Sequence, residues 1–297
     1  MDLFKTKPGI LERLHILEET FTNATNKQAP YYTEGEHGRN ARCFAVCPLC
    51  DNPIQIIGLY KAHDEGRKPY GRHYPKDILD LANYDEEAYY GCYYANPDRK
   101  KRVVKRKPET ARSMAMYNLL REQFDRLIYI LETSIEIKIS YAFAEEILTQ
   151  YLFNEGWLFY ESTYANLPWM LIYAMQAKPL INRWILKGGM LYQFLQESCK
   201  AVKLTDIPDS KFAKVEAKNG FVDLSFYLCN HKIAKDGESI KETYKLVIVE
   251  NDTVIFERVI SVEQDFLAKL IALPPERSRR NPKLQKIAEG LMKTDFP

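Results

Sequence analysis

The chain has 297 residues, 46% of them hydrophobic, and its 42 lysines and arginines nearly balance 40 aspartates and glutamates. This composition predicts a globular protein with a substantial core and excludes a polycation that binds nucleic acid through its overall charge. The N-terminal sequence lacks the apolar stretch of a signal peptide and no apolar run reaches the length of a membrane span, which predicts a cytoplasmic protein with no membrane contact.

Residues 1–98 are predicted to form an N-terminal arm and a zinc-binding module. The spacing of apolar residues, the positions of turn-forming residues and the alternation of apolar with polar residues identify its elements. In chain order we expect a helix over residues 8–21, a polar loop or arm over 22–42, a strand over 53–60, a turn over 61–72, a second strand or loop carrying His73, and a short helix within 76–90.

Cysteine is concentrated in this first segment, where four of the six cysteines lie between Cys43 and Cys92. Cys47 and Cys50 are separated by two residues on a predicted tight turn, so that both thiolates can face one point. In a reducing compartment such a pair is typical of a metal site rather than of a disulfide. The sequence therefore predicts a zinc site.

The ligands predicted for this zinc ion are Cys47, Cys50, His73 and Cys92, and Cys43 is a reserve that can replace His73 or Cys92. His63 is interpreted as a solvated loop residue. Three cysteines with one histidine form a closed tetrahedral set, which is typical of structural zinc and argues against metal catalysis.

The Cys47-Pro48-Leu49-Cys50 turn, the strand after it and the basic stretch Arg67–Tyr74 resemble the zinc-ribbon head of competence proteins of the CoiA type. The resemblance ends with this stretch. Those proteins carry a nuclease domain behind the head, but no matching nuclease signature follows here. The resemblance therefore implies a zinc-ribbon module and does not imply nuclease activity.

A basic linker is predicted over residues 99–108, ending at Pro108. The residues expected to bind nucleic acid or an acidic protein partner are Arg99, Lys100, Lys101, Arg102, Lys105, Arg106 and Lys107. They can neutralise several phosphates, and Tyr93 and Tyr94 just before them can stack on bases. The alternative is a solvated linker. A second basic cluster, Arg277–Arg280, lies between two predicted helices.

Residues 109–204 are predicted to be helical and residues 205–297 to form an α+β region. Alternating apolar residues at 135–139 fit a strand locally, but helix formers on both sides favour one long helix with a break near 133–134. The expected elements are helices over 108–153, from Asn166, over 179–186 and over 190–202, strands over 222–228, 244–249 and 254–262, and helices over 263–273 and from Asn281. The predicted fold class is α+β, with a zinc-ribbon-like module, a helical middle and a C-terminal antiparallel sheet with helices.

The sequence contains no phosphate-binding loop, nucleophile elbow or zinc-protease motif. Neighbouring carboxylates such as Glu145 and Glu146 point in different directions on a helix and are interpreted as surface charges. The leading hypothesis is a non-enzymatic, zinc-stabilised binding protein that forms homo-oligomers and binds or inhibits a protein complex, in a phage or mobile-element setting. The alternative is a nucleic-acid-binding protein or an accessory subunit of a DNA- or RNA-processing enzyme.

Overall fold

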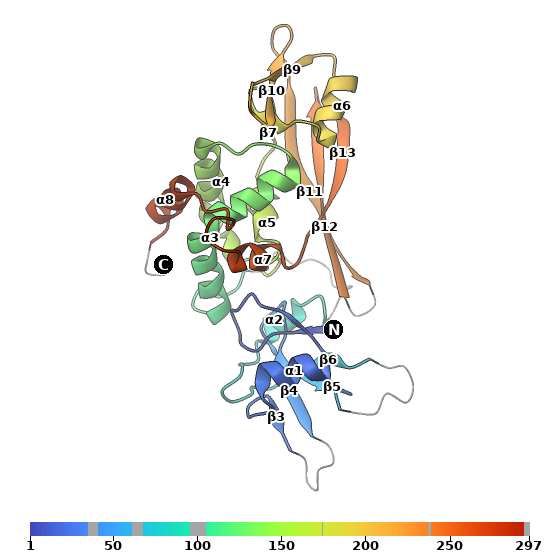
Figure 1. Cartoon of the computed structure of the whole chain (residues 1–297), viewed down its shortest axis with the longest axis vertical. Coiled ribbons are helices and arrows are strands. Elements are labelled where there is room, and N and C mark those ends of the chain that lie inside the picture. Colours follow the sequence, from blue (N-terminus) through green and yellow to red (C-terminus); the bar gives the residue numbers. More distant parts are fainter. Residues whose placement is uncertain (35–40, 61–67, 96–104, 174, 237–238, 294–297) are drawn as a thin grey trace. The chain divides into compact units, whose positions relative to one another are not determined.

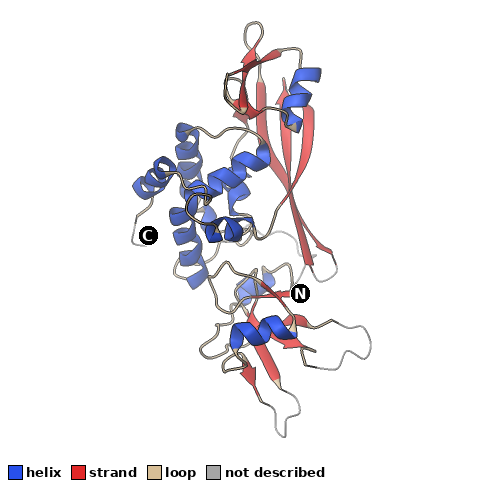
Figure 2. Cartoon of the chain, in the orientation of Figure 1, coloured by secondary structure: helices blue, strands red, loops and turns tan. Residues whose placement is uncertain are grey.

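The computed structural model describes residues 1–34, 41–60, 68–95, 105–173, 175–236 and 239–293. These residues combine helices with antiparallel sheets, which confirms the predicted α+β class (Figures 1 and 2). The chain forms two compact units, one of residues 1–117, 158–164 and 233–241 and the other of residues 118–157, 165–232 and 242–297. The expected four-segment division stays a prediction. None of the described helices is long and apolar enough to cross a membrane.

The first unit contains a four-stranded antiparallel sheet in the order β3-β4-β5-β6. Its strands are β3 (Tyr32–Thr33), β4 (Arg42–Val46), β5 (Pro53–Ile57) and β6 (Tyr70–His73). Two short strands, β1 (Leu3–Phe4) and β2 (Leu14–His15), form a separate pair, and the helices of this unit are α1 (Glu18–Thr25) and α2 (Glu86–Tyr90). Phe4, Phe21 and Ile54 are fully buried in its core.

The predicted helix over residues 8–21 is wrong, because β2 occupies Leu14–His15 and α1 begins only at Glu18. Gly9 adopts a positive φ of 78°, which interrupts a helical backbone. The predicted loop over 22–42 contains the end of α1 and the edge strand β3. The predicted strand after Cys50 and the arrival of His73 on a second strand are confirmed as β5 and β6.

The helices of the second unit pack around fully buried Phe124, Leu127 and Trp169. They are α3 (Ala111–Ile135, counted with the first unit up to Tyr117), α4 (Tyr141–Phe153), α5 (Leu167–Tyr173), α6 (Met190–Ser198), α7 (Phe266–Ala272) and α8 (Pro282–Leu291), with a 3-10 turn at Gly156–Leu158. Asn281 caps α8 and Pro282 occupies its first turn, as predicted.

The predicted long helix is divided at Glu136, which has a left-handed φ of 62°. Ile137 then pairs with Ile185 in an isolated antiparallel bridge, so the local alternation of apolar residues does reflect extended backbone. The carboxylate of Glu136 accepts a hydrogen bond from the backbone N–H of Leu191 (3.0 Å) and pairs with Arg258. Leu191 and Arg258 are distant from Glu136 in the sequence, which explains why the helix ends at Ile135 and not near residues 133–134 as predicted.

Two antiparallel sheets complete the second unit. One has the order β8-β10-β9 and the other β13-β12-β11-β7, and residues 233–241, from the end of β11 to the start of β12, are counted with the first unit. The strands are β7 (Lys178–Pro179), β8 (Trp184–Leu186), β9 (Val202–Asp206), β10 (Phe212–Ala217), β11 (Leu224–Asp236), β12 (Ser239–Glu250) and β13 (Thr253–Ser261).

The predicted C-terminal strands are confirmed as β11, β12 and β13, but the predicted helix over 179–186 is wrong. Its apolar residues instead pair with β10, with Ile185 opposite Ala213. The helix expected over 190–202 ends at Ser198, and Val202 opens β9. Strands β9 and β10 were not predicted, since both are short and the start of β9 falls within the helix expected over 190–202.

Candidate metal centre

The turn between β4 and β5 presents Cys47 and Cys50 to the same point. The N–H of Cys47 donates to the carbonyl of Asn52 (2.8 Å), and the N–H of Asp51 donates to the carbonyl of Cys47 (3.1 Å). Asp51 adopts a left-handed φ of 59°, which closes the turn. The backbone thus reverses within six residues between Val46 and Pro53 and leaves both thiols on one side.

The other two members of the cluster come from separate segments. His73 is the last residue of β6 and pairs with Ile54, which lies near the start of β5. Cys92 follows α2, where its N–H donates to the carbonyl of Tyr89 (3.0 Å). The sheet therefore positions His73, and the end of a short helix positions Cys92.

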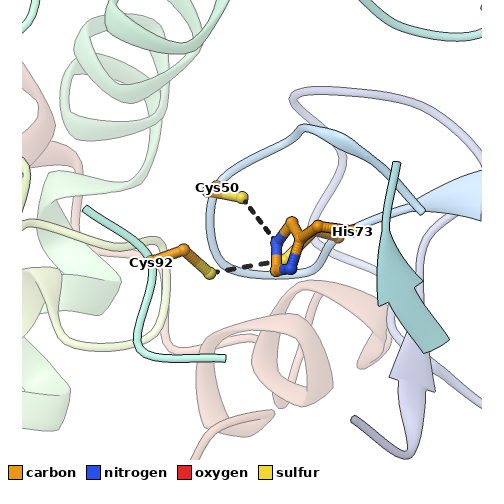
Figure 3. A group of neighbouring side chains, drawn as sticks. Cys50, His73 and Cys92 are labelled. Atoms are coloured by element: carbon orange, nitrogen blue, oxygen red, sulfur yellow. Dashed lines mark hydrogen bonds between the residues drawn. The ribbon is translucent and has the colours of Figure 1, made fainter. Parts of the chain in front are cut away.

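One potential ligand atom from each of Cys47, Cys50, His73 and Cys92 lies within 4.8 Å of the others. The sulfurs of Cys47 and Cys92 are 3.7 Å apart, and the sulfur of Cys50 lies 3.3 Å from Nε2 of His73. Cys50, His73 and Cys92 point toward one another in Figure 3. All six cysteines of the chain are free thiols, so the cluster contains no disulfide. This arrangement can hold a metal ion.

The three thiols of the cluster are buried, and Cys47 forms hydrogen bonds with Cys50 and Cys92. Burial alone would raise the pKa of Cys47, but hydrogen bonds from Cys50 and Cys92 outweigh burial and hold that pKa well below its ordinary value. Burial and hydrogen bonds to Cys47 and Cys50 raise the pKa of Cys92 well above its ordinary value. The pKa shifts of Cys47 and Cys92 therefore favour a thiolate at Cys47, the form of cysteine that binds a metal ion.

Asn52 supports the cluster from its outer side. Its Nδ2 donates to the sulfur of Cys50 (3.4 Å) and to the carbonyl of Asp85 (2.9 Å), while its Oδ1 accepts from the N–H of Asp85 (2.6 Å). Asp85 in turn caps α2 by accepting from the N–H of Ala88 (2.9 Å). One amide side chain thus connects the cysteine turn to the helix that precedes Cys92.

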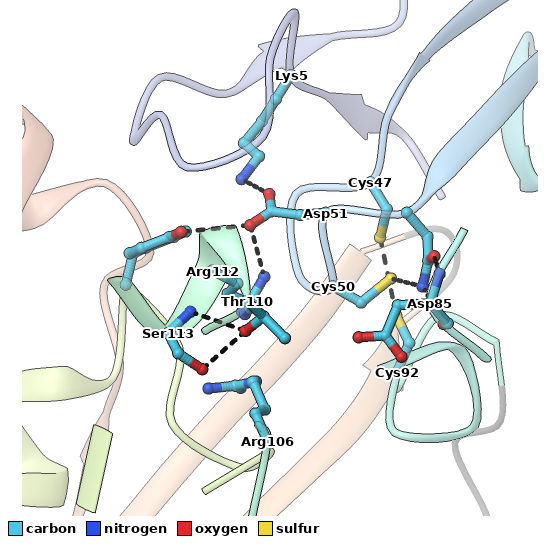
Figure 4. Close-up of polar contacts among 12 residues, drawn as sticks. Lys5, Cys47, Cys50, Asp51, Asp85, Cys92, Arg106, Thr110, Arg112 and Ser113 are labelled. Carbon is cyan, nitrogen blue, oxygen red and sulfur yellow. Dashed lines mark hydrogen bonds and ion pairs between the residues drawn. The ribbon is translucent and has the colours of Figure 1, made fainter. Parts of the chain in front are cut away.

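A buried charge cluster lies next to the cysteine turn (Figure 4). Asp51 forms ion pairs with Lys5 and with Arg112 (3.2 Å), and it accepts a hydrogen bond from the hydroxyl of Tyr164 (3.2 Å). Burial opposes ionisation of Asp51, but the two cations outweigh it and hold its pKa below the ordinary value. Arg112 also interacts electrostatically with Cys50. Lys5 and Arg112 thus place two basic groups around one carboxylate beside the thiols, and burial lowers the pKa of Lys5.

Sequence reasoning missed these charged residues. Lys5, Asp51 and Arg112 are separated by long stretches of chain, and in a sequence each reads as an ordinary surface charge. The position of Asp51 directly after Cys50 was the only local signal. Their burial becomes visible only once the N-terminal strand and the start of α3 lie against the cysteine turn.

The reserve ligand Cys43 lies within β4, where it pairs with Ile56, and it is not a member of the cluster. Burial raises the pKa of its thiol to about 11. His63 lies outside the described residues. The sheet therefore brings Cys47, Cys50, His73 and Cys92 together and leaves Cys43 in the core.

The predicted basic site is only partly described, since Arg99, Lys100, Lys101 and Arg102 lie outside the described residues. Lys105 and Lys107 are exposed. Arg106 is only 3% exposed, and its Nη2 donates to the carbonyls of Tyr160 (3.0 Å) and Ser162 (2.7 Å). Arg106 therefore points into the first unit and does not belong to the exposed part of the basic segment.

The chain matches no protein-family model, no curated protein and no solved structure in comparisons with each. The resemblance of the cysteine turn to a zinc ribbon stays a prediction. The function is therefore argued from the geometry of the site.

Proposed function

We propose that the protein is a non-enzymatic, zinc-stabilised binding protein that engages a macromolecular partner, a protein complex that it binds or inhibits. The observation that carries this proposal is the convergence of Cys47, Cys50, His73 and Cys92 within 4.8 Å. Four protein ligands complete a tetrahedron and leave no open position for a substrate or water. A closed set of this kind supports a structural role for the metal.

The distances within the cluster favour zinc. Sulfur ligands about 2.3 Å from a tetrahedral zinc ion lie about 3.8 Å from each other, and the observed separation of Cys47 and Cys92 is 3.7 Å. Three thiolates and a neutral imidazole around a divalent ion carry one net negative charge. Arg112, which interacts electrostatically with Cys50 and Cys47, supports such a centre by offsetting part of that charge.

The same unit exposes large apolar side chains that suit a protein partner. Leu17, Leu79 and Tyr90 are 55%, 85% and 59% exposed. Aromatic residues such as Tyr90 are enriched at protein interfaces, and the exposed leucines can add apolar area to such a contact. We place the protein in a reducing compartment such as the cytoplasm, because the thiols must stay free to bind the metal, and we propose that it forms homo-oligomers.

Metal analysis of purified protein tests the zinc centre, with Cys47→Ser as the site variant and Cys229→Ser as the control. Cys229 lies in β11, outside the cluster. We expect one zinc ion per chain in the wild type and in Cys229→Ser, and loss of zinc in Cys47→Ser. A metal-free wild type, or equal metal content in all three proteins, would contradict the proposal.

Affinity capture from the native host, compared between the wild type and Cys47→Ser, tests the binding function. We expect a defined protein set to be retained by the wild type and lost with the metal. A wild type that stays monomeric and retains no more protein than Cys47→Ser would contradict the binding role while leaving the zinc result intact.

Nucleic acid is the second candidate partner, and the exposure of Lys105 and Lys107 is the observation that favours it. Reversing the charges of Lys100, Lys101, Lys105 and Lys107 should abolish salt-dependent binding to a labelled oligonucleotide if this candidate is right. Arg106 is left unchanged because its side chain is buried. Equal binding before and after charge reversal, or no binding by the wild type, would remove this candidate.

A further inference from the structure

A cavity of about 750 Å³ lies within the second unit. Its walls come from α3, the start of α4, β8, the segment that leads into β10, and the turn before α8. The volume falls in the range of sites that hold a small ligand or a short peptide. The cavity has no part in the metal centre, whose residues belong to the first unit.

Four aromatic side chains line the cavity: Tyr129, Tyr141, Trp184 and Phe212. Cations already cover the faces of three of these rings, and the ammonium of Lys283 lies 5.4 Å from the centre of Tyr141. The guanidinium of Arg279 lies 5.0 Å from the centre of the Tyr129 ring, and the ammonium groups of Lys211 and Lys138 lie 5.2 and 5.4 Å from the centre of Phe212. The rings therefore act as supports that hold cationic groups in place.

The charges lining the cavity do not cancel. Arg280 pairs with Asp125 (3.2 Å), and Lys138 pairs with Glu132 (2.9 Å). Within the described part of the chain, Lys211 and Arg279 form no ion pair. The third carboxylate of the lining belongs to Glu276, which pairs with neither Arg280 nor Lys138. The cavity thus offers two exposed cations to a ligand.

The turn that carries Arg279 is held by neighbouring groups. Nε of Arg126 donates to the carbonyl of Ser278 (2.8 Å), and the hydroxyl of Ser278 donates to the carbonyl of Pro275 (2.8 Å). Arg280 donates to the carbonyl of Glu122 (3.1 Å). Arg279 itself has a left-handed φ of 58°, which these contacts maintain. The guanidinium is therefore positioned before any ligand binds.

We propose that this cavity binds an acidic segment of a protein partner, in which two carboxylates pair with Lys211 and Arg279 while an apolar side chain packs against Trp184. The proposal rests on the proposed function, since it specifies the chemistry of a protein partner. The guanidinium of Arg279 and the ammonium of Lys211 can each pair with a carboxylate of the partner, and Trp184 supplies apolar area.

A single-stranded nucleic acid fits this cavity less well. Base stacking requires open ring faces, but the faces of Tyr129 and Phe212 carry the protein's own cations.

Binding of a fluorescein-labelled decapeptide of alternating glutamate and leucine, followed by fluorescence anisotropy at about 0.15 M salt, tests the proposal. The site variant is Lys211→Glu with Arg279→Glu. The matched control is Lys200→Glu with Lys218→Glu, two exposed lysines of the same unit that do not line the cavity. Circular dichroism verifies that both variants are folded.

We expect the wild type to bind the acidic peptide, the site variant to lose at least about tenfold in affinity, and the control to stay within about twofold. Equal weakening by both variants would show only general charge attraction and would overturn the proposal. Absence of wild-type binding, or displacement of the peptide by a deoxythymidine decamer at lower concentration than by unlabelled peptide, would also overturn it. Because zinc content is measured separately, these outcomes leave the metal centre untouched.

Discussion

Asn52 and Asp85 exchange two hydrogen bonds although they stand 33 positions apart in the sequence, with the amide of Asn52 donating to the carbonyl of Asp85 and accepting from its N–H. The same amide also donates to the sulfur of Cys50. Groups that orient the ligands of a metal are themselves determinants of metal affinity. Asn52 therefore connects the cysteine turn to the segment that leads to Cys92.

Asn52→Ala should weaken metal binding by about 10- to 100-fold, the usual range for loss of a supporting contact. The reason is that the Cys50 thiolate loses a donor and the Cys92 segment loses its anchor. Competition with a chromophoric chelator measures the affinity. Asn23→Ala, at an exposed position of α1, is the control and should bind metal like the wild type. Equal affinities in the two variants would contradict a supporting role for Asn52.

Asp51→Asn should destabilise the protein by about 3–5 kcal/mol, because two buried cations would lose their carboxylate. Lys5→Met should cost less, since Asp51 would keep Arg112 as a partner and the buried ammonium would be removed. Urea unfolding at neutral pH compares the two variants. A larger loss for Lys5→Met than for Asp51→Asn would show that the charge balance assigned to this cluster is incorrect.

Gly189→Ala should destabilise the protein by about 1–3 kcal/mol, the typical cost of overpacking. A Cβ at this position would lie 2.5 Å from Oε2 of Glu136, whose carboxylate is fixed by Leu191 and Arg258. Gly290→Ala in α8 is the matched control, because its added Cβ meets no atom within 4 Å. The control should be neutral or should gain up to about 1 kcal/mol from helix propensity. Similar urea midpoints for both variants would argue against a rigid Glu136.

Removal of the metal should loosen the first unit selectively. We expect chelation to increase hydrogen exchange in β4 and β5, which lead into and out of the cysteine turn, because the ligands would lose the bond that holds them together. Helices α4 and α8 of the second unit should retain their protection. Hydrogen-exchange mass spectrometry of the wild type with and without chelator measures both regions. An even increase over the whole chain would mean that the metal controls global rather than local stability.

The sequence by itself determined the features that depend on short-range geometry. Cysteines separated by two residues can face one point on a tight turn, and this spacing identified Cys47 and Cys50. Alternation with a period of two identified β11, β12 and β13, and proline after a capping asparagine identified the start of α8. Each of these signals is complete within a few neighbouring residues.

The tertiary structure alone decided the features that depend on distant partners. Residues 179–186 have apolar positions compatible with a helix, but hydrogen bonds with β10 make Trp184–Leu186 a strand. Asp51 can be buried because Lys5 and Arg112, which are distant in the sequence, form ion pairs with its carboxylate. The cavity that contains Arg279 forms where segments far apart in the chain lie together. The sequence named His73 and Cys92 as ligands and kept Cys43 in reserve, and it is strand register and the position of α2 that bring His73 and Cys92, rather than Cys43, to the cysteine turn. Local spacing restricts the conformation of a segment, whereas burial and pairing between distant segments select among the conformations that remain.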